Sequence, residues 1–307
     1  GQRTRHEFRL TRFGRGFPHF GSDAVGNLLV LVPRSSDRFN AYILESEEDI
    51  EELQAALGVE VHGRWGILAR DGAVDPEAEA SRCIERHSRA FAEHCEDFPP
   101  GEAFALAARE ALDACVPGYR TASADTRLTR AIEAEYEIFR KVEERICLPM
   151  IRGPFSSIGQ FLSAAAPIMN RRKARAGRSL ERHVELILRD AGIPFEAQPA
   201  IDGRPDLVIP SVEAYNDPTF PEERLFIVAM KTTCKDRWRQ ILREGRRVRR
   251  KHLITLQQGI SSRQIREMMD ANVVLITPES LHKFFERDSR SSLMSLERFL
   301  IHIRNTG

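Results

Sequence analysis

The stretch "RPDLVIPSVEAYNDPTFPEERLFIVAMKTTCKDRWRQILREG" (Arg204–Gly245) holds two apolar runs, each beside one charged side chain. Leu207–Ile209 follows directly after Asp206, and Leu225–Met230 leads directly into Lys231. Short apolar runs rich in β-branched residues are typical of buried strands. If these strands are neighbours, the aspartate and the lysine can lie side by side at their ends.

Strands and helices alternate along the last third of the chain. We expect a helix at Ser179–Ala191, before this stretch, and a helix at Asp236–Glu244, within it. Beyond it we expect a strand at 252–257, a helix at 262–271, a strand at 272–278 and a short helix at 279–285. This alternation predicts an α/β fold in which helices cover both faces of a mixed sheet.

The beginning of the chain has a different pattern. Asn27–Pro33 and Phe39–Glu45 are short β-branched and aromatic runs, which predict a hairpin. Ser46–Gly58 predicts a helix with Ser46 as its N-cap. After a boundary with Gly and Pro, the spacing becomes helical up to about Leu162. We therefore expect a small β-rich domain at 1–75, a helical linker at 76–100 and the main α/β domain at 101–307.

The charges of the chain nearly balance. With 46 basic and 45 acidic residues in 307, no global field points to a nucleic acid. Two local basic clusters, Asn170–Arg178 and Arg243–Lys251, are either solvated faces or phosphate-binding surfaces. No stretch has the ~20 apolar residues that a membrane span needs, and the N-terminus has no secretory signal. We expect a soluble, cytoplasmic protein.

The five cysteines are odd in number and form no CxxC pair. This usage favours reduced thiols over a disulfide framework. Cys83, His87, His94 and Cys95 have ligand chemistry for zinc, but their spacing is poor for a zinc site. Since the stretch predicts one helix, scattered helix residues are the better interpretation.

Asp206 and Lys231 together suit phosphodiester hydrolysis. A carboxylate can hold a divalent cation that polarises the phosphate, and a lysine can orient or deprotonate the attacking water. The pair fits the loose PD-(D/E)xK nuclease pattern, although Ala229 stands where that pattern expects a second acid. Glu244, on the expected helix, is the candidate replacement; alternatively, it only offsets its arginine neighbours. Alternatively, Asp206 is only a turn residue, and Lys231 only buries its aliphatic stem while its ammonium reaches solvent.

Four longer segments are more specific than this pattern. "NRRKARAGRSLERH", "PDLVIPSVEAYNDPTFP", "AMKTTCKDRWRQIL" and "HLITLQQG" resemble the catalytic domain of the EcoRII family of type II restriction endonucleases, and the similarity spans most of the chain from Glu133 onward. The resemblance implies a restriction-endonuclease-like fold and Mg²⁺-dependent cleavage of double-stranded DNA by a homodimer. It also implies a bacterial-type cytoplasmic location and a cognate DNA methyltransferase that protects host DNA.

The resemblance also implies site residues. The implied catalytic residues are Glu181, Asp206, Lys231, Glu244 and Tyr215, with Mg²⁺ held by Asp206, Glu244 and the Met230 carbonyl. For Tyr215, packing under its loop is an equal alternative. The rival function is a catalytically silent, sequence-specific DNA-binding protein of the same fold, and the complete set of catalytic residues argues against it.

The DNA site implied is short, with outer C:G pairs around a central A:T pair. Arginine and lysine can donate to guanine, and aspartate can accept from cytosine, although Asp236 alternatively only caps a helix. Tyr136 resembles an aromatic residue that walls a flipped base, while Ile132 stands where the family has an arginine. The implied base readers are Lys235, Asp236 and Arg237, with Asn170 near the central pair and Arg171, Arg172 and Lys173 on phosphates.

The first segments resemble the latter part of the family's effector-binding domain, a β-barrel of the plant B3 type. The resemblance rests on "TRHEFRLTRFGRG", "NLLVLV" and "SEEDIEELQAALG". It implies that residues 1–75 bind a second, effector copy of the DNA site through Arg3, Arg5, Glu7 and Arg9. Alternating charges on a strand could equally form a solvated face. Because the resemblance begins mid-domain, we expect either a chain that starts late or a reduced module.

Overall fold

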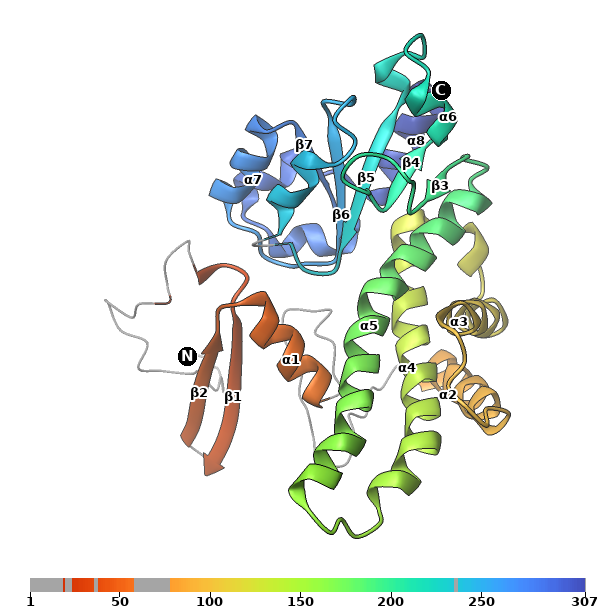
Figure 1. The fold of residues 1–307 in the computed structure, drawn as a ribbon, viewed down its shortest axis with the longest axis vertical. Helices are drawn as coiled ribbons and strands as arrows, with labels where there is room; N and C mark the ends of the chain where they lie inside the picture. The colour runs from red at the N-terminus through yellow and green to blue at the C-terminus, as the bar shows by residue number, and fades with distance from the viewer. Residues whose placement is uncertain (1–18, 20–23, 36–37, 58–77, 235–236, 307) are drawn as a thin grey trace, which may run out of the picture.

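The computed structural model describes residues 19, 24–35, 38–57, 78–234 and 237–306. Its centre is a five-stranded sheet in the order β3-β4-β5-β6-β7 (Figure 1). The strands are β3 (Glu196–Ala197), β4 (Leu207–Ile209), β5 (Phe226–Lys231), β6 (Lys251–Thr255) and β7 (Val273–Ile276). β3, β4 and β5 run antiparallel, whereas β5, β6 and β7 run parallel. The expected mixed sheet is confirmed.

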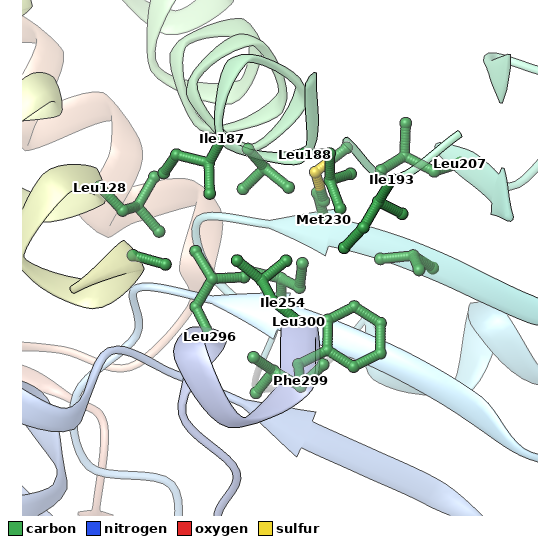
Figure 2. Close-up of a cluster of buried hydrophobic side chains, with 14 of the residues drawn as sticks. Leu128, Ile187, Leu188, Ile193, Leu207, Met230, Ile254, Leu296, Phe299 and Leu300 are labelled. Carbon is green, nitrogen blue, oxygen red and sulfur yellow. The ribbon is translucent and has the colours of Figure 1, made fainter. Parts of the chain in front are cut away.

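One face of the sheet is covered by α4 (Ala124–Ile151), α5 (Ile158–Asp190) and α8 (Leu296–Thr306). Because strand side chains alternate between faces, Val228 and Met230 of β5 point to this side. They pack in one core with Leu188 of α5 and Phe299 of α8 (Figure 2). α8 lies beyond the series of elements predicted from the sequence, so one of the covering helices was not predicted.

The opposite face is covered by the 3₁₀ helix η5 (Trp238–Arg243) and by α7 (Ser262–Asp270). Ala229 and Leu253 of the sheet pack there with Trp238 and Met268. The remaining short helices of this region are α6 (Val212–Asn216), η4 (Glu222–Arg224), η6 (Glu279–Phe284) and η7 (Arg287–Ser292). Both faces are therefore buried, as the alternation of elements predicts.

α2 (Ala78–Glu93) and α3 (Gly101–Cys115) pack against α4, and η3 (Tyr119–Thr121) connects α3 to α4. The rings of Phe104 and Phe139 lie 5.7 Å apart in this second core. α2 falls within the stretch expected as a linker, and its residues share the core of the main domain.

Cys83 of α2 and Cys115 of α3 form a disulfide. The expectation that all five cysteines are reduced thiols was therefore wrong. The two residues are 32 positions apart, and only the packing of two helices brings them together. Cys95, Cys147 and Cys234 are free and buried.

Two further elements were incompletely predicted. α5 is one helix of 33 residues, whereas only its last part, near Ser179–Ala191, was expected. Pro167 lies inside it without ending it. None of the helices in the described part of the chain is long and apolar enough to cross a membrane.

Ahead of α2, the described residues form the antiparallel pair β1 (Leu28–Ser35) and β2 (Arg38–Leu44), followed by α1 (Glu47–Leu57). The expected hairpin and helix are confirmed, and the Ser46 hydroxyl caps α1 by accepting from the Asp49 amide at 3.1 Å. α1 lies between this hairpin and α5 (Figure 1). Six residues with predicted DNA contacts lie outside the described residues: Arg3, Arg5, Glu7, Arg9, Lys235 and Asp236.

Candidate active site

Asp206 and Lys231 lie side by side because β4 and β5 run antiparallel. Leu207 pairs with Val228, so the beginning of β4 meets the end of β5. Asp206 Oδ2 accepts hydrogen bonds from the Met230 amide at 2.6 Å and from Lys231 Nζ at 2.9 Å. The aspartate is only 8% exposed, so this is a nearly buried carboxylate with one cationic partner.

Glu244 lies just beyond η5, in extended backbone with φ −88° and ψ 135°. In the described part of the helix expected at Asp236–Glu244, the structure has a 3₁₀ helix that ends at Arg243, so Glu244 lies outside it. Glu244 is buried, and its Oε2 has no hydrogen-bond partner among the described residues. Burial raises the pKa of Glu244 to about 7; the charge of Lys231 opposes this rise and that of Asp206 adds to it.

Two glycines let the chain at Glu244 approach its neighbours closely. A Cβ at Gly203 would lie 2.5 Å from Glu244 Cα, and a Cβ at Gly245 would lie 2.6 Å from Ile227 Cδ1. Both glycines have positive φ, which other residues rarely adopt. Glu244 is thereby held over the face of β5 that carries Ile227, Ala229 and Lys231, because alternate residues of a strand share a face.

Asp202 and Lys251 fix the chain that follows Glu244. Asp202 accepts from the Gly245 amide through its carbonyl at 2.8 Å and from the Arg246 amide through Oδ2 at 2.7 Å. The buried Lys251 Nζ donates to the carbonyls of Gly245 and Val248. Neither residue was predicted as part of the site from the sequence, where Lys251 is only the last member of a basic cluster.

Tyr215 contacts this supporting chain. Its hydroxyl donates to Asp202 Oδ1 at 2.5 Å and accepts from the Arg247 amide at 3.3 Å. Its ring packs with Ile227 and Val248. The hydroxyl is thus joined to the residues that fix Glu244, while the ring has the packing role given as the alternative.

Glu181 of α5 approaches the same group of charges from the other side of the sheet's end. Burial raises the pKa of Glu181, the charge of Asp206 raises it further, and that of Lys231 lowers it. Glu181, Met230 and Lys231 line a cleft of about 560 Å³. The charges of Asp206 and Lys231 therefore act on both Glu181 and Glu244.

This group of side chains suits a divalent cation. Within the part of the chain that the structure describes, Glu244 Oε2 is buried without a hydrogen-bond partner, and Asp206 Oδ1 has a single long contact of 3.4 Å from Gln198 Nε2. Carboxylate and carbonyl oxygens are the ligands that Mg²⁺ prefers. A cation would also offset the repulsion between the two carboxylates, which adds to the rise that burial causes in the pKa of Glu244.

α1 lies along the same cleft and contacts two predicted DNA-binding residues. Arg237 donates through Nε to Glu47 Oε2 and through Nη2 to Glu51 Oε1, both at 2.8 Å. Arg172 forms a bidentate pair with Glu143 of α4 and also donates to the Ala55 carbonyl of α1. Acids and carbonyls therefore occupy the guanidinium groups that the sequence assigned to DNA.

The other predicted recognition residues have varied surroundings. Asn170 and Lys173 are exposed, whereas the Arg171 guanidinium lies 3.9 Å from the centre of the Phe98 ring. Tyr136 lines the cleft, and the Arg175 guanidinium of α5 lies 4.8 Å from the centre of its ring. Arg175 was not singled out in the sequence, where it stands among many arginines.

The comparisons with known proteins agree on one family. A family model described as "EcoRII C terminal" matches residues 139–300. The chain is 34% identical over 314 residues to the type II restriction enzyme EcoRII of Escherichia coli, covering 98% of this chain and 76% of that protein. It is 31% identical over 142 residues to the type II restriction enzyme SsoII of Shigella sonnei, covering 42% of this chain and 45% of that protein.

Solved structures show the same fold. Metal-depleted Ecl18kI in complex with uncleaved, modified DNA has a TM-score of 0.55 at 21% identity, covering 74% of this chain and 84% of that one. A complex of restriction endonuclease PspGI with substrate DNA has a TM-score of 0.55 at 16% identity, covering 68% of this chain and 93% of that one. The restriction-endonuclease-like fold expected from the sequence is confirmed.

Proposed function

The chain belongs to the EcoRII family of type II restriction endonucleases, and we propose that it uses Mg²⁺ to cleave duplex DNA at a short site flanked by C:G pairs. The family match makes it a site-specific endonuclease. The catalytic proposal rests on Glu244 Oε2, which is buried near the Asp206–Lys231 pair and has no hydrogen-bond partner among the residues described. Burying such a carboxylate is costly unless a cation meets it, which argues against a silent site.

Each residue has its own role in the proposed reaction. Asp206, Glu244 and the Met230 carbonyl would hold Mg²⁺, which when bound supplies positive charge to the scissile phosphate. Lys231 Nζ, held by Asp206, would orient the attacking water and stabilise the charge that develops on the phosphate. Glu181, across the cleft, would orient the same water. The water oxygen forms a bond to phosphorus, and the bond to the leaving sugar oxygen breaks.

We place Tyr215 among the positioning residues. Its hydroxyl bonds to Asp202, which in turn holds the Gly245 and Arg246 amides directly after Glu244. Tyr215→Phe should therefore lower the cleavage rate through a misplaced Glu244 while leaving DNA affinity unchanged. A loss of affinity equal to the loss of rate would contradict this role.

Recognition would follow from the segment after Lys231 and from α5. Arg237, with Lys235 and Asp236, would read base edges in the major groove, and Asn170 would lie near the central pair. Arg171, Arg172 and Lys173 would contact phosphates. Tyr136 would form the wall of a pocket for a flipped central base. The Arg175 guanidinium lies against the Tyr136 ring and would supply a positive charge there, where Ile132 replaces the arginine of the family.

The assembly proposed is a homodimer, because symmetric cutting of a palindrome needs two catalytic centres. Residues 1–75 would form the B3-like effector module, with Arg3, Arg5, Glu7 and Arg9 on a second copy of the site, and 101–307 would be the catalytic domain. A cognate methyltransferase would protect host DNA. A short duplex carrying the site, added in trans, tests the module: it should stimulate wild-type cleavage and not that of Arg3→Ala/Arg5→Ala.

Plasmid cleavage tests the catalytic proposal. With Mg²⁺ the wild type should give discrete fragments, and EDTA should abolish them. Lys231→Ala and Glu244→Gln should each lower the rate by roughly 10²-fold or more, because each removes a charge that acts on the transition state. Lys283→Ala, an exposed lysine of η6, serves as the matched control and should cleave normally.

The same variants separate the enzyme from a silent DNA-binding protein. Lys231→Ala should still bind site-containing DNA with near wild-type affinity, measured by fluorescence anisotropy. Tight binding by the wild type without any cleavage in Mg²⁺ would sink the catalytic proposal and favour the rival function.

A further inference from the structure

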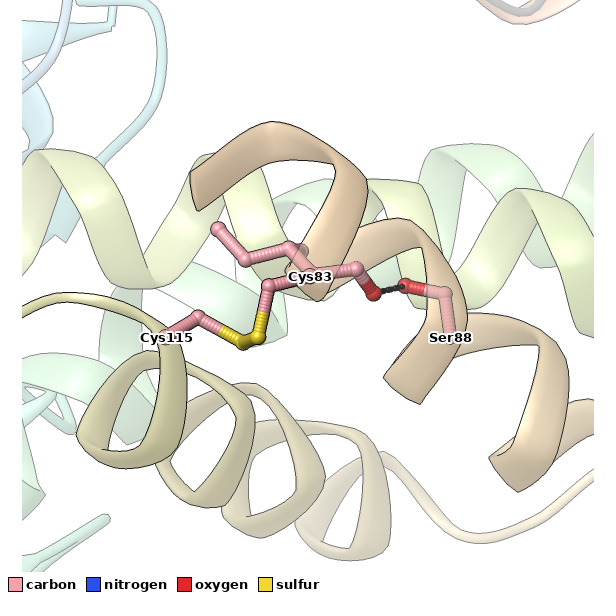
Figure 3. The surroundings of a disulfide bond; sticks show 4 residues. Cys83, Ser88 and Cys115 are labelled. Carbon is pink, nitrogen blue, oxygen red and sulfur yellow. Dashed lines mark hydrogen bonds between the residues drawn. A yellow bond between two sulfur atoms is a disulfide. The ribbon is translucent and has the colours of Figure 1, made fainter. Parts of the chain in front are cut away.

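The side chains of Cys83, His87 and Cys115 lie close together, and in the sequence they are well separated from the proposed catalytic residues. Their ligand atoms all lie within 4.8 Å of one another. Cys83 and His87 are one helical turn apart on α2, and Cys115 is the last residue of α3. The two sulfur atoms are bonded to each other in the structure (Figure 3).

We propose that reduction of this disulfide creates a binding site for Zn²⁺ formed by Cys83, His87 and Cys115. Thiolate and imidazole are the ligands that Zn²⁺ prefers, and hard cations such as Mg²⁺ bind them poorly. A cysteine and a histidine four residues apart on a helix present their ligand atoms on the same side. Cys115, from the neighbouring helix, completes the triangle.

The packing of the two helices suits such a site. The Cα atoms of Cys83 and Cys115 are 5.6 Å apart. Tetrahedral Zn²⁺ with Zn–S bonds of about 2.3 Å holds two sulfurs roughly 3.7 Å apart. Rotation about the two Cα–Cβ bonds supplies that separation without moving α2 or α3. Cys115 is buried and His87 is exposed, so a water molecule can take the fourth position on the solvent side.

The disulfide and the zinc site exclude each other. A dithiol reductant supplies two electrons and two protons to the S–S bond, becomes a disulfide itself and leaves two thiols on the protein. Zn²⁺ then binds both as thiolates, and the two protons pass to solvent. Either state joins the beginning of α2 to the end of α3.

Neighbouring residues of the same types do not share this arrangement. His94 Nδ1 contacts the Ala90 carbonyl at 2.7 Å, and Cys95 Sγ donates to the Phe91 carbonyl at 3.3 Å. Both lie just beyond the end of α2. In the sequence these two stand near Cys83 and His87, whereas the third ligand, Cys115, is 32 positions from Cys83. His94 and Cys95 therefore provide matched control substitutions.

Cobalt titration of the full chain tests the proposal. The protein is reduced with a phosphine, freed of metal and titrated with Co²⁺ in saturating Mg²⁺, which keeps the carboxylates occupied. We expect a thiolate-to-cobalt charge-transfer band that saturates at one equivalent per chain and is displaced by Zn²⁺. The band should be lost in the oxidised protein, in Cys83→Ser and in Cys115→Ser. Affinity should fall by roughly tenfold or more in His87→Ala and stay unchanged in His94→Ala and Cys95→Ser.

Two results would overturn the proposal: no charge-transfer band in the reduced wild type, or a band that survives both cysteine substitutions. A second measurement needs no variant. Zn²⁺ in saturating Mg²⁺ should raise the melting temperature of the reduced protein and leave that of the oxidised protein unchanged. An equal shift in both redox states, or no shift in either, would contradict the site.

Discussion

His252 of β6 is a buried histidine surrounded by rings. It is 2% exposed, and the centres of the Phe226 and Phe299 rings lie 5.4 and 4.9 Å from its own. Burial lowers the pKa of His252 from 6.5 to about 3, with a smaller contribution from the positive charges of Arg250 and His302. The His252 imidazole is therefore neutral in the folded protein at pH values above about 3.

This histidine should make the fold sensitive to acid. Below pH 6.5 the unfolded chain takes up a proton at His252 and the folded chain does not, so stability is lost as the pH falls. The slope is about 1.4 kcal/mol per pH unit until the folded pKa is reached. Denaturant unfolding of His252→Leu should lack this contribution between about pH 4 and 6.

His94→Ala, which removes an exposed histidine, is the control and should keep the wild-type slope. Wild type and variant are compared at each pH, so that the carboxylates contribute equally to both. Parallel curves for wild type and His252→Leu would show that His252 does not couple to folding.

α5 is an element whose successive parts carry different surfaces. Glu181 lies in its last third and the basic cluster Asn170–Arg178 in its middle. The stretch Gly153–Asn170, which includes the first third of α5, has no charged residue. Ile158 is 79% and Leu162 57% exposed there, and Met150 at the end of α4 is 56% exposed. An apolar helix normally packs against a partner surface, and a second copy of the chain would cover this one in the proposed dimer.

Charged residues introduced on this surface should therefore dissociate the proposed dimer. Ile158→Lys/Leu162→Lys should sediment as a monomer and lose double-strand cleavage, because one catalytic centre cuts one strand. Ile301→Lys, an equally drastic change at a 46% exposed residue of α8, should leave the sedimentation coefficient unchanged. A dimer that persists in the double variant would place the interface elsewhere.

At the scale of the whole molecule, α1 pairs with a cation that we propose contacts DNA. Glu47 and Glu51 pair with Arg237, and Thr233 also donates to Glu51 at 3.0 Å. In the proposed complex, a DNA contact of Arg237 would compete with these two pairs. Each partly exposed pair is worth about 0.2–1 kcal/mol, so removing both should raise DNA affinity by roughly 2- to 30-fold.

Glu47→Gln/Glu51→Gln tests this competition by anisotropy with a site-containing duplex. Glu48→Gln/Glu52→Gln makes the same change of net charge on the exposed side of α1 and controls for long-range electrostatics. The gain in DNA affinity should be seen only in Glu47→Gln/Glu51→Gln, and it should shrink at high salt. An equal gain in both variants would mean that net charge, and not the contact with Arg237, limits binding.

The sequence by itself determined the elements whose signals are local. Apolar runs marked β4 through β7, a capping serine marked α1, and the pair Asp206 and Lys231 was found because each stands directly beside its strand. The longer matching segments gave the family. These signals are local because strand burial, caps and strand ends leave a pattern within a few residues.

Only the tertiary structure decided the rest, because it depends on residues far apart in the chain. Glu244 is not on a helix; it is held by Gly203, Asp202 and Lys251, whose spacing carries no periodic signal. Cys115 meets Cys83 because α2 and α3 pack on α4, and α1 reaches Arg237 across the cleft. Contacts of this kind follow from how whole elements pack, so no short stretch of sequence could reveal them.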